Sequence, residues 1–182
     1  MRTLTAALVL AALVASTGLA QRRRFPPPPE HNDPRQETPP PRPSQESAQE
    51  GARQLFEAIV HDDPERGLPF FMSREVFRQV KGVADPDRFY DRMLALFHRD
   101  VHALHEELGD DAERATFLRL ELSRRRGWVV PRQESNRLPY WAQRHNWLYY
   151  QVGEEERRFE VRTMNSWDGQ WFVTHLSEFR HR

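Results

Sequence analysis

Three histidines have the spacing that most directly suggests chemistry. His98, His102 and His105 follow one another at intervals of four and three, so they share one face of a helix, and Asp91 lies on that face two turns earlier. Two imidazoles one turn apart can chelate zinc, copper or nickel, and a carboxylate can complete the shell. The stretch lacks the fourth ligand and the catalytic Glu of known zinc motifs, so the alternative is a solvated face beside the core.

A second polar group lies near the carboxyl end, in a predicted hairpin. Asp168-Gly169 supplies the positive φ values of a two-residue type I′ turn between two alternating runs. This turn sets Asn165 opposite Phe172 and Thr163 opposite Thr174. The candidate ligand-binding side chains of this hairpin are Arg162, Thr163, Asn165, Thr174 and His175.

These hairpin side chains could orient a small ligand or polarise a carbonyl group. The alternative is ordinary hydrogen bonding across a half-buried sheet. Isomerase-type chemistry also needs a general acid or base, for which Asp91, Asp100 and His175 are the nominal candidates. We find no catalytic triad pattern, nucleophile elbow or glycine-rich phosphate loop, so no catalytic residue is assigned and no bound cofactor is expected.

Tyr140 and Trp141 form an aromatic pair beside Pro139, in a predicted loop rich in proline and arginine. No periodic pattern predicts their burial. Because aromatic side chains are frequent at protein interfaces, the pair is a candidate contact for a partner protein or for a second copy of the chain.

The elements that must position these residues change type midway along the chain. Helical spacing of apolar residues, with Asp85 as N-cap, Pro86 at the first position and Gly109 as terminator, predicts a long final helix. After it the apolar period becomes two. Helices followed by an antiparallel meander predict an α+β fold, in which N-terminal helices pack on a curved antiparallel sheet. We also expect a short edge strand over 68–72.

The amino-terminal region predicts export. Residues 1–20 have a basic start, an apolar run from Leu4 to Val14 and small residues before a cleavage point after Ala20, which is the layout of a signal peptide. Three arginines at 22–24 leave a retained membrane anchor as the alternative. The chain has no cysteine, which excludes disulfides and a lipid anchor on cysteine.

Residues 21–45 hold nine of the fourteen prolines and almost nothing apolar. Such a segment predicts a disordered, polyproline-like spacer. A proline-rich ligand for another module is the alternative. Residues 46–182 then form a single α+β domain. The formal net charge of the chain is zero, which argues against a nucleic-acid partner.

Two stretches resemble a known superfamily. Ala52, Ala58 and Ile59, the acidic pair Asp62-Asp63, and Leu68-Pro69-Phe70-Phe71 with Phe77 look like the opening region of the SnoaL-like or nuclear-transport-factor-2-like superfamily. The run from Trp167 to Leu176 is similar to its closing hairpin. The resemblance implies a cone-shaped α+β roll with a pocket between helices and sheet. It does not imply a particular chemistry.

The sequence thus predicts an exported protein of the periplasm or cell exterior, most simply a non-enzymatic module that binds a small ligand or a protein. A small-molecule lyase or isomerase using the pocket is the alternative.

Overall fold

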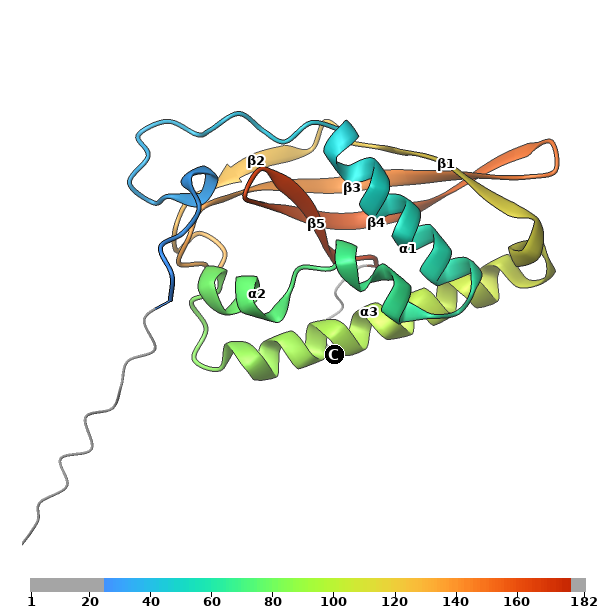
Figure 1. Cartoon of the computed structure of the whole chain (residues 1–182), viewed down its shortest axis with the longest axis horizontal. Helices are drawn as coiled ribbons and strands as arrows, with labels where there is room; N and C mark the ends of the chain where they lie inside the picture. Colours follow the sequence, from blue (N-terminus) through green and yellow to red (C-terminus); the bar gives the residue numbers. More distant parts are fainter. Residues whose placement is uncertain (1–24, 178–182) are drawn as a thin grey trace, which may run out of the picture.

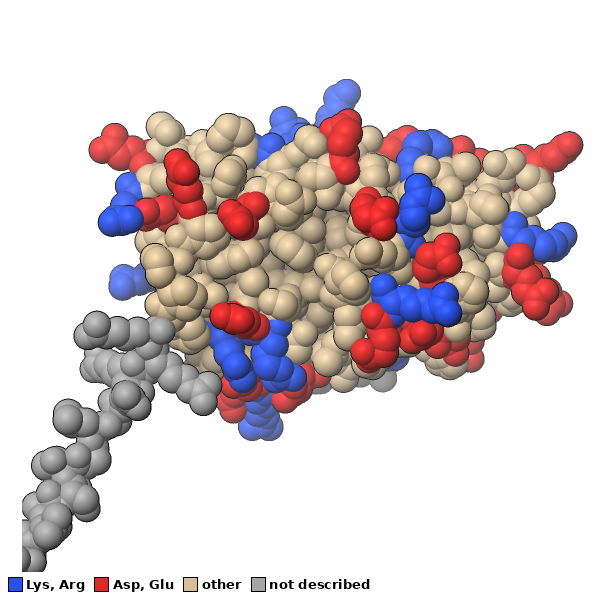
Figure 2. Space-filling model, in the orientation of Figure 1, with Lys and Arg blue, Asp and Glu red and all other residues tan. Residues whose placement is uncertain are grey.

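The computed structural model describes residues 25–177, in which helices pack on one antiparallel sheet. The α+β prediction is therefore confirmed (Figure 1). The predicted signal peptide, residues 1–20, and the arginines at 22–24 lie outside the described residues. None of the described helices is long and apolar enough to cross a membrane. On the face in Figure 2, acidic and basic side chains are interspersed.

The helices begin and end at residues whose chemistry favours it. The Asp85 carboxylate accepts a hydrogen bond from the Arg88 N–H at the start of α3, and Ser73 caps α2 in the same way. Gly109 ends α3 with φ 53°. The α-helices are α1 (Gln49–Val60), α2 (Arg74–Val80) and α3 (Pro86–Leu108), and the 3-10 helices are η1 (Glu30–Asn32), η2 (Glu46–Ala48), η3 (Pro64–Phe70) and η4 (Gly109–Arg114).

The sheet has five strands within the described residues, all paired antiparallel. Its order is β1-β3-β4-β5. The fifth strand, β2, pairs with residues 140–143 of β3, whereas β1 pairs with residues 147–152 of β3. The two longest strands, β3 and β4, lie at the centre of the sheet. The strands are β1 (Ala115–Glu121), β2 (Arg126–Val129), β3 (Tyr140–Val152), β4 (Glu155–Trp167) and β5 (Gln170–His175).

Near its turn, the closing hairpin has the predicted register. Trp167 pairs with Gln170, and Asp168 and Gly169 have φ values of 49° and 72°, as a type I′ turn requires.

Further from the turn the predicted register is wrong. Thr163 pairs with His175 rather than with Thr174, because β5 holds one extra residue where Met164 pairs with Val173. Such a bulge cannot be recognised from alternation alone, since the residues on either side still alternate.

The predicted stripe of α3 faces the core. Tyr90, Met93, Phe97 and Val101 are buried, and α3 packs against β5. Aromatic side chains fill the space between helices and sheet: the Phe71 ring centroid lies 4.8 Å from that of Phe97. Burial of such side chains contributes about 1.5–3 kcal/mol each.

The edge strand expected over 68–72 is largely a 3-10 helix. Residues 64–70 form η3, whose N-cap Asp63 accepts a hydrogen bond from the Glu65 N–H. Only Phe71 pairs with the sheet, through an isolated parallel bridge to Val173. Pro69 favours this outcome because it has no N–H to donate to a strand ladder.

The disordered spacer expected over 21–45 also differs from the structure. Its described part, residues 25–45, is called the strap below. The strap, drawn in blue to cyan, runs past β2 and then leads into η2 and α1 (Figure 1). Asn32 and Pro43 are buried, and the Trp171 indole Nε1 donates to the Pro43 carbonyl oxygen at 3.1 Å. Proline carbonyls can thus bind the domain although the segment has few apolar side chains.

Candidate functional site

The structure does not bring the histidines of α3 into one metal site. His105 Nδ1 donates to the Ile59 carbonyl oxygen at 2.9 Å, and His102 Nδ1 lies 3.0 Å from the Asp62 carboxylate. His98 Nε2 lies 3.8 Å from Glu65.

Asp91 pairs with Arg74 at 2.5 Å, away from the histidines. No group of three His, Cys, Asp or Glu side chains suited to a metal ion occurs among residues 25–177. His102 and His105 instead bond to the neighbouring α1–η3 region, whereas His98 Nε2 is buried without a hydrogen-bond partner among the described residues. The hydrogen bond to Asp62 raises the pKa of exposed His102, which is a surface ion-pair effect.

The structure brings together only some of the hairpin side chains. Thr174 Oγ1 donates to the Thr163 carbonyl oxygen at 3.4 Å and lies 3.1 Å from His175 Nδ1. Asn165 lies further along the hairpin, opposite Phe172. Its side-chain oxygen is buried and has no hydrogen-bond partner among the described residues.

Arg162 lies beside His145 and Glu160, and its charge also acts on His175. His145 Nδ1 lies 2.6 Å from the Glu160 carboxylate, and the Arg162 guanidinium lies 3.5 Å from the same oxygen. His145 has φ 57°, which is unusual within a strand. Within residues 25–177, these contacts join Thr163, Thr174 and His175 to one another and place Arg162 beside His145 and Glu160.

Beneath the 130–139 loop lies a second group of titratable side chains. Burial, and then the nearby charge of Lys81, lower the pKa of His175 to about 4. Burial also lowers the pKa of Lys81, whose Nζ lies 5.8 Å from the centre of the Tyr140 ring. The Tyr140 hydroxyl donates to Glu134 at 3.0 Å, and Arg144 also pairs with Glu134.

The predicted loop pair Tyr140 and Trp141 opens strand β3. Tyr140 is fully buried, so the expectation that it forms an exposed contact is wrong. Trp141 is half-buried, and its indole Nε1 donates to the Pro40 carbonyl oxygen at 3.0 Å. The loop ends at Pro139, and the next two residues pair with Val129 and Trp128 of β2.

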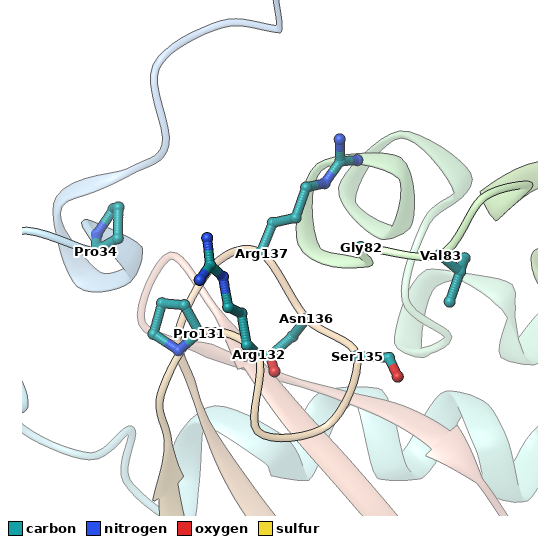
Figure 3. Close-up of a pocket in the computed structure, with 8 residues that line it drawn as sticks. All are labelled: Pro34, Gly82, Val83, Pro131, Arg132, Ser135, Asn136 and Arg137. Carbon is teal, nitrogen blue, oxygen red and sulfur yellow. The ribbon is translucent and has the colours of Figure 1, made fainter.

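An open cleft of about 750 Å³ lies between the α2–α3 connection and the 130–139 loop. This volume is within the range of small-molecule sites. Figure 3 shows Arg132 and Arg137 extending from the loop, with Pro34 of the strap on one side and Val83 on the other. The lining residues are Pro34, Gly82, Val83, Pro131, Arg132, Ser135, Asn136 and Arg137.

Buried Asn136 stabilises the conformation of the 130–139 loop, which is called the cleft loop below. Its side-chain Nδ2 donates to the carbonyl oxygens of Val130 at 3.0 Å and Leu138 at 2.9 Å, and its Oδ1 accepts from the Glu134 N–H at 2.9 Å. Three of the four bonds that a carboxamide can make are thus formed.

The loop is also bonded to the end of α2. The Gly82 N–H donates to the Ser135 carbonyl oxygen at 2.8 Å, and the Arg137 N–H donates to that of Val80 at 2.7 Å. These bonds hold the cleft walls in place without a ligand.

Two cleft residues have the left-handed backbone conformation. Arg132 has φ 73° and Ser135 has φ 54°. Non-glycine residues in this region cost of order 1 kcal/mol each and cluster at binding sites, where surrounding bonds maintain them. Here the Arg132 N–H donates to the Asn136 carbonyl oxygen at 2.7 Å, so the two conformations belong to one bonded turn.

The two arginines of the cleft differ in their availability. Arg137 is engaged: its guanidinium donates to the Arg78 carbonyl oxygen and lies 5.4 Å from the Phe25 ring. Arg132 is exposed, and its guanidinium makes no hydrogen bond or ion pair with residues 25–177. The cleft thus presents an available cation beside the apolar surfaces of Pro34, Val83 and Pro131.

No protein family, curated protein or solved structure matches the chain.

Sequence reasoning did not select Arg132, Asn136 or Arg137. The signal was present as Pro131 to Pro139, a loop bounded by prolines that contains two arginines and a turn-forming asparagine. The opposite wall of the cleft could not be predicted from the sequence. It is formed by the α2–α3 connection, which lies about fifty residues earlier in the chain and contacts the loop only in the fold.

Proposed function

We propose that this protein is an exported, non-enzymatic binding module that holds a small anionic molecule in the cleft beside Arg132. The observation that carries the proposal is the available guanidinium of Arg132 in a preformed cleft. A guanidinium binds carboxylate and phosphate groups through two parallel N–H donors. The apolar walls favour a ligand with an apolar body attached to its anionic group.

Calorimetric titration tests this proposal with phenyl phosphate and inorganic phosphate as probes. We expect both to bind, and phenyl phosphate to bind more tightly because its ring can contact Pro34 and Pro131. Arg132→Gln should weaken binding of both by about tenfold, as loss of a charge-assisted hydrogen bond does. Arg124→Gln is the matched control because Arg124 is exposed and outside the cleft. Equal affinities of the two variants would contradict the proposal.

A lyase or isomerase is the alternative function. It is favoured by the lowered pKa of Lys81, since deprotonated lysine can act as a general base. His175 is a weaker candidate base, because a pKa of about 4 leaves it little basicity at neutral pH. Lys81 is the chain's single lysine. Acetic anhydride labelling at pH 7 therefore tests the alternative: Lys81 should react faster than a free lysine if it is both accessible and deprotonated, and an unreactive Lys81 would exclude the role.

Export to the periplasm or the cell exterior is part of the same proposal and rests on the pattern of residues 1–20. A relationship to the SnoaL-like superfamily is also part of the proposal and rests on the residues that resemble its opening region and closing hairpin. A partner protein or a second copy of the chain would have to bind elsewhere than at buried Tyr140.

A further inference from the structure

Three tryptophans and one serine form a row across the sheet. Trp128 of β2 pairs with Trp141 of β3, and Ser166 of β4 pairs with Trp171 of β5. Trp141 lies across from Ser166 of β4. The backbone N–H of Trp141 donates to Ser166 Oγ at 2.9 Å, and the next residue pair of these strands is Ala142 with Asn165. Residues opposite each other on neighbouring strands project to the same face. We call these four residues the tryptophan row.

The strap crosses this row in an extended form. It contains the sequence Pro39-Pro40-Pro41-Arg42-Pro43, in which each residue before a proline is restricted to extended backbone conformations. Trp141 Nε1 donates to the Pro40 carbonyl oxygen at 3.0 Å, and Trp171 Nε1 donates to the carbonyl oxygens of Pro43 and Ser44, both at 3.1 Å.

The spacing of these contacts follows from the two regular structures. A polyproline II helix has three residues per turn, so Pro40 and Pro43 present their carbonyl groups on one side, about 9 Å apart. Trp141 and Trp171 are two strands apart, which is also about 9.5 Å. One polyproline turn therefore matches two strand spacings, and small Ser166 between the indoles leaves room for the backbone.

Arg42 provides a side-chain contact beside this match. Its guanidinium donates to Gln143 Oε1 at 2.9 Å, and Gln143 is buried in the strand position two residues after Trp141. Trp128 is half-buried, and its indole makes no hydrogen bond with the described residues, so the row extends beyond the part that the strap uses.

We propose that the tryptophan row is a binding site for proline-rich, arginine-containing segments of a partner protein, and that the strap is its intramolecular occupant. Aromatic rows that bind preformed polyproline helices are a general mode of peptide recognition. The site is separate from the cleft of Arg132, so either proposal can fail without the other. A short tether corresponds to a millimolar effective concentration of the strap. A free peptide should therefore bind the unmodified protein weakly.

The test uses a peptide with the sequence of residues 37–45 and monitors the indole N–H signals of the full chain by NMR. Pro40→Gly/Pro43→Gly in the protein keeps the carbonyl groups but makes the strap more flexible. We expect this variant to bind the peptide about tenfold more tightly than the wild type. Pro26→Gly/Pro27→Gly is the matched control, because these prolines are exposed in the same segment.

Trp141→Phe, added to the Pro40→Gly/Pro43→Gly variant, should abolish the tighter peptide binding. Trp147→Phe in the same variant should not, since Trp147 lies outside the row. Unchanged peptide affinity in the loosened variant would overturn the proposal. So would dimer formation on sedimentation without peptide uptake, because the occupant would then be a second copy. If Pro40→Gly/Pro43→Gly does not fold, Arg42→Ala replaces it, because it weakens the docking of the strap by removing the hydrogen bond to Gln143. This variant should also bind the peptide more tightly than the wild type, and unchanged affinity would again overturn the proposal.

Discussion

The side-chain oxygen of Asn32 accepts a hydrogen bond of 2.9 Å from the N–H of Asp168, which lies 136 residues later. The Asn32 Nδ2 donates to the Pro139 carbonyl oxygen at 2.8 Å, and the Asn32 side chain is fully buried. A residue of the strap therefore joins the closing hairpin turn to the end of the cleft loop.

Asn32→Ala should consequently destabilise the whole domain. It leaves the Asp168 N–H and the Pro139 carbonyl group without their partner, at a cost of about 1–3 kcal/mol for each buried group. We expect a loss of about 2 kcal/mol or more in the free energy of unfolding, measured in urea. Glu30→Ala, at an exposed strap position, should change it by less than about 0.5 kcal/mol. A neutral Asn32→Ala would mean that the strap is a spacer after all.

Gly51→Ala tests the packing of α1 on η3. A Cβ at Gly51 would lie 2.0 Å from Cδ2 of the buried Phe70 ring. Alanine gains about 1 kcal/mol in helix propensity over glycine, but overpacking a core costs about 1–3 kcal/mol, and this overlap is severe. We therefore expect a lower melting temperature, whereas Gly127→Ala, whose Cβ meets no atom within 4 Å, should leave it nearly unchanged.

Stability should depend on pH through His175. The folded protein keeps this imidazole neutral down to a pKa of about 4, against 6.5 in the unfolded chain, so the unfolded state binds more protons between these values. The contribution is complete above pH 6.5 and is lost as the pH falls toward 4. It amounts to about 3 kcal/mol at most.

Urea unfolding of wild type and His175→Asn at several pH values measures this contribution. The difference in free energy of unfolding between the two proteins should shrink as the pH is lowered from 7 to 4, because only the wild type loses the His175 contribution. A constant difference would show that the imidazole titrates alike in both states. Carboxyl groups with lowered pKa values, such as that of Asp87, contribute equally to both proteins.

Elements whose determinants are local were predicted well from the sequence. Asp85, Pro86 and Gly109 define α3 because caps act within one turn, and Asp168-Gly169 defines the hairpin because its conformation is intrinsic to those residues. The candidate metal site was not reproduced because its outcome depended on Asp62 and Ile59, which approach only in the fold.

The strap was mispredicted for a different reason. Composition estimates how much apolar side-chain surface a segment can bury, but the strap is held largely by its carbonyl groups and by Asn32. Their donors are the indoles of Trp141 and Trp171, more than a hundred residues away. The same limitation hid the cleft, since Pro34 forms one of its walls.

Hydrogen exchange at the tryptophan indoles tests the docking of the strap on the tryptophan row most directly. Because its Nε1 is bonded to the Pro40 carbonyl oxygen, the Trp141 indole N–H should exchange with deuterium markedly more slowly than that of neighbouring Trp128. The protection should fall in Pro40→Gly/Pro43→Gly. Exchange of the Trp141 indole as fast as that of Trp128 in the wild type would contradict the account.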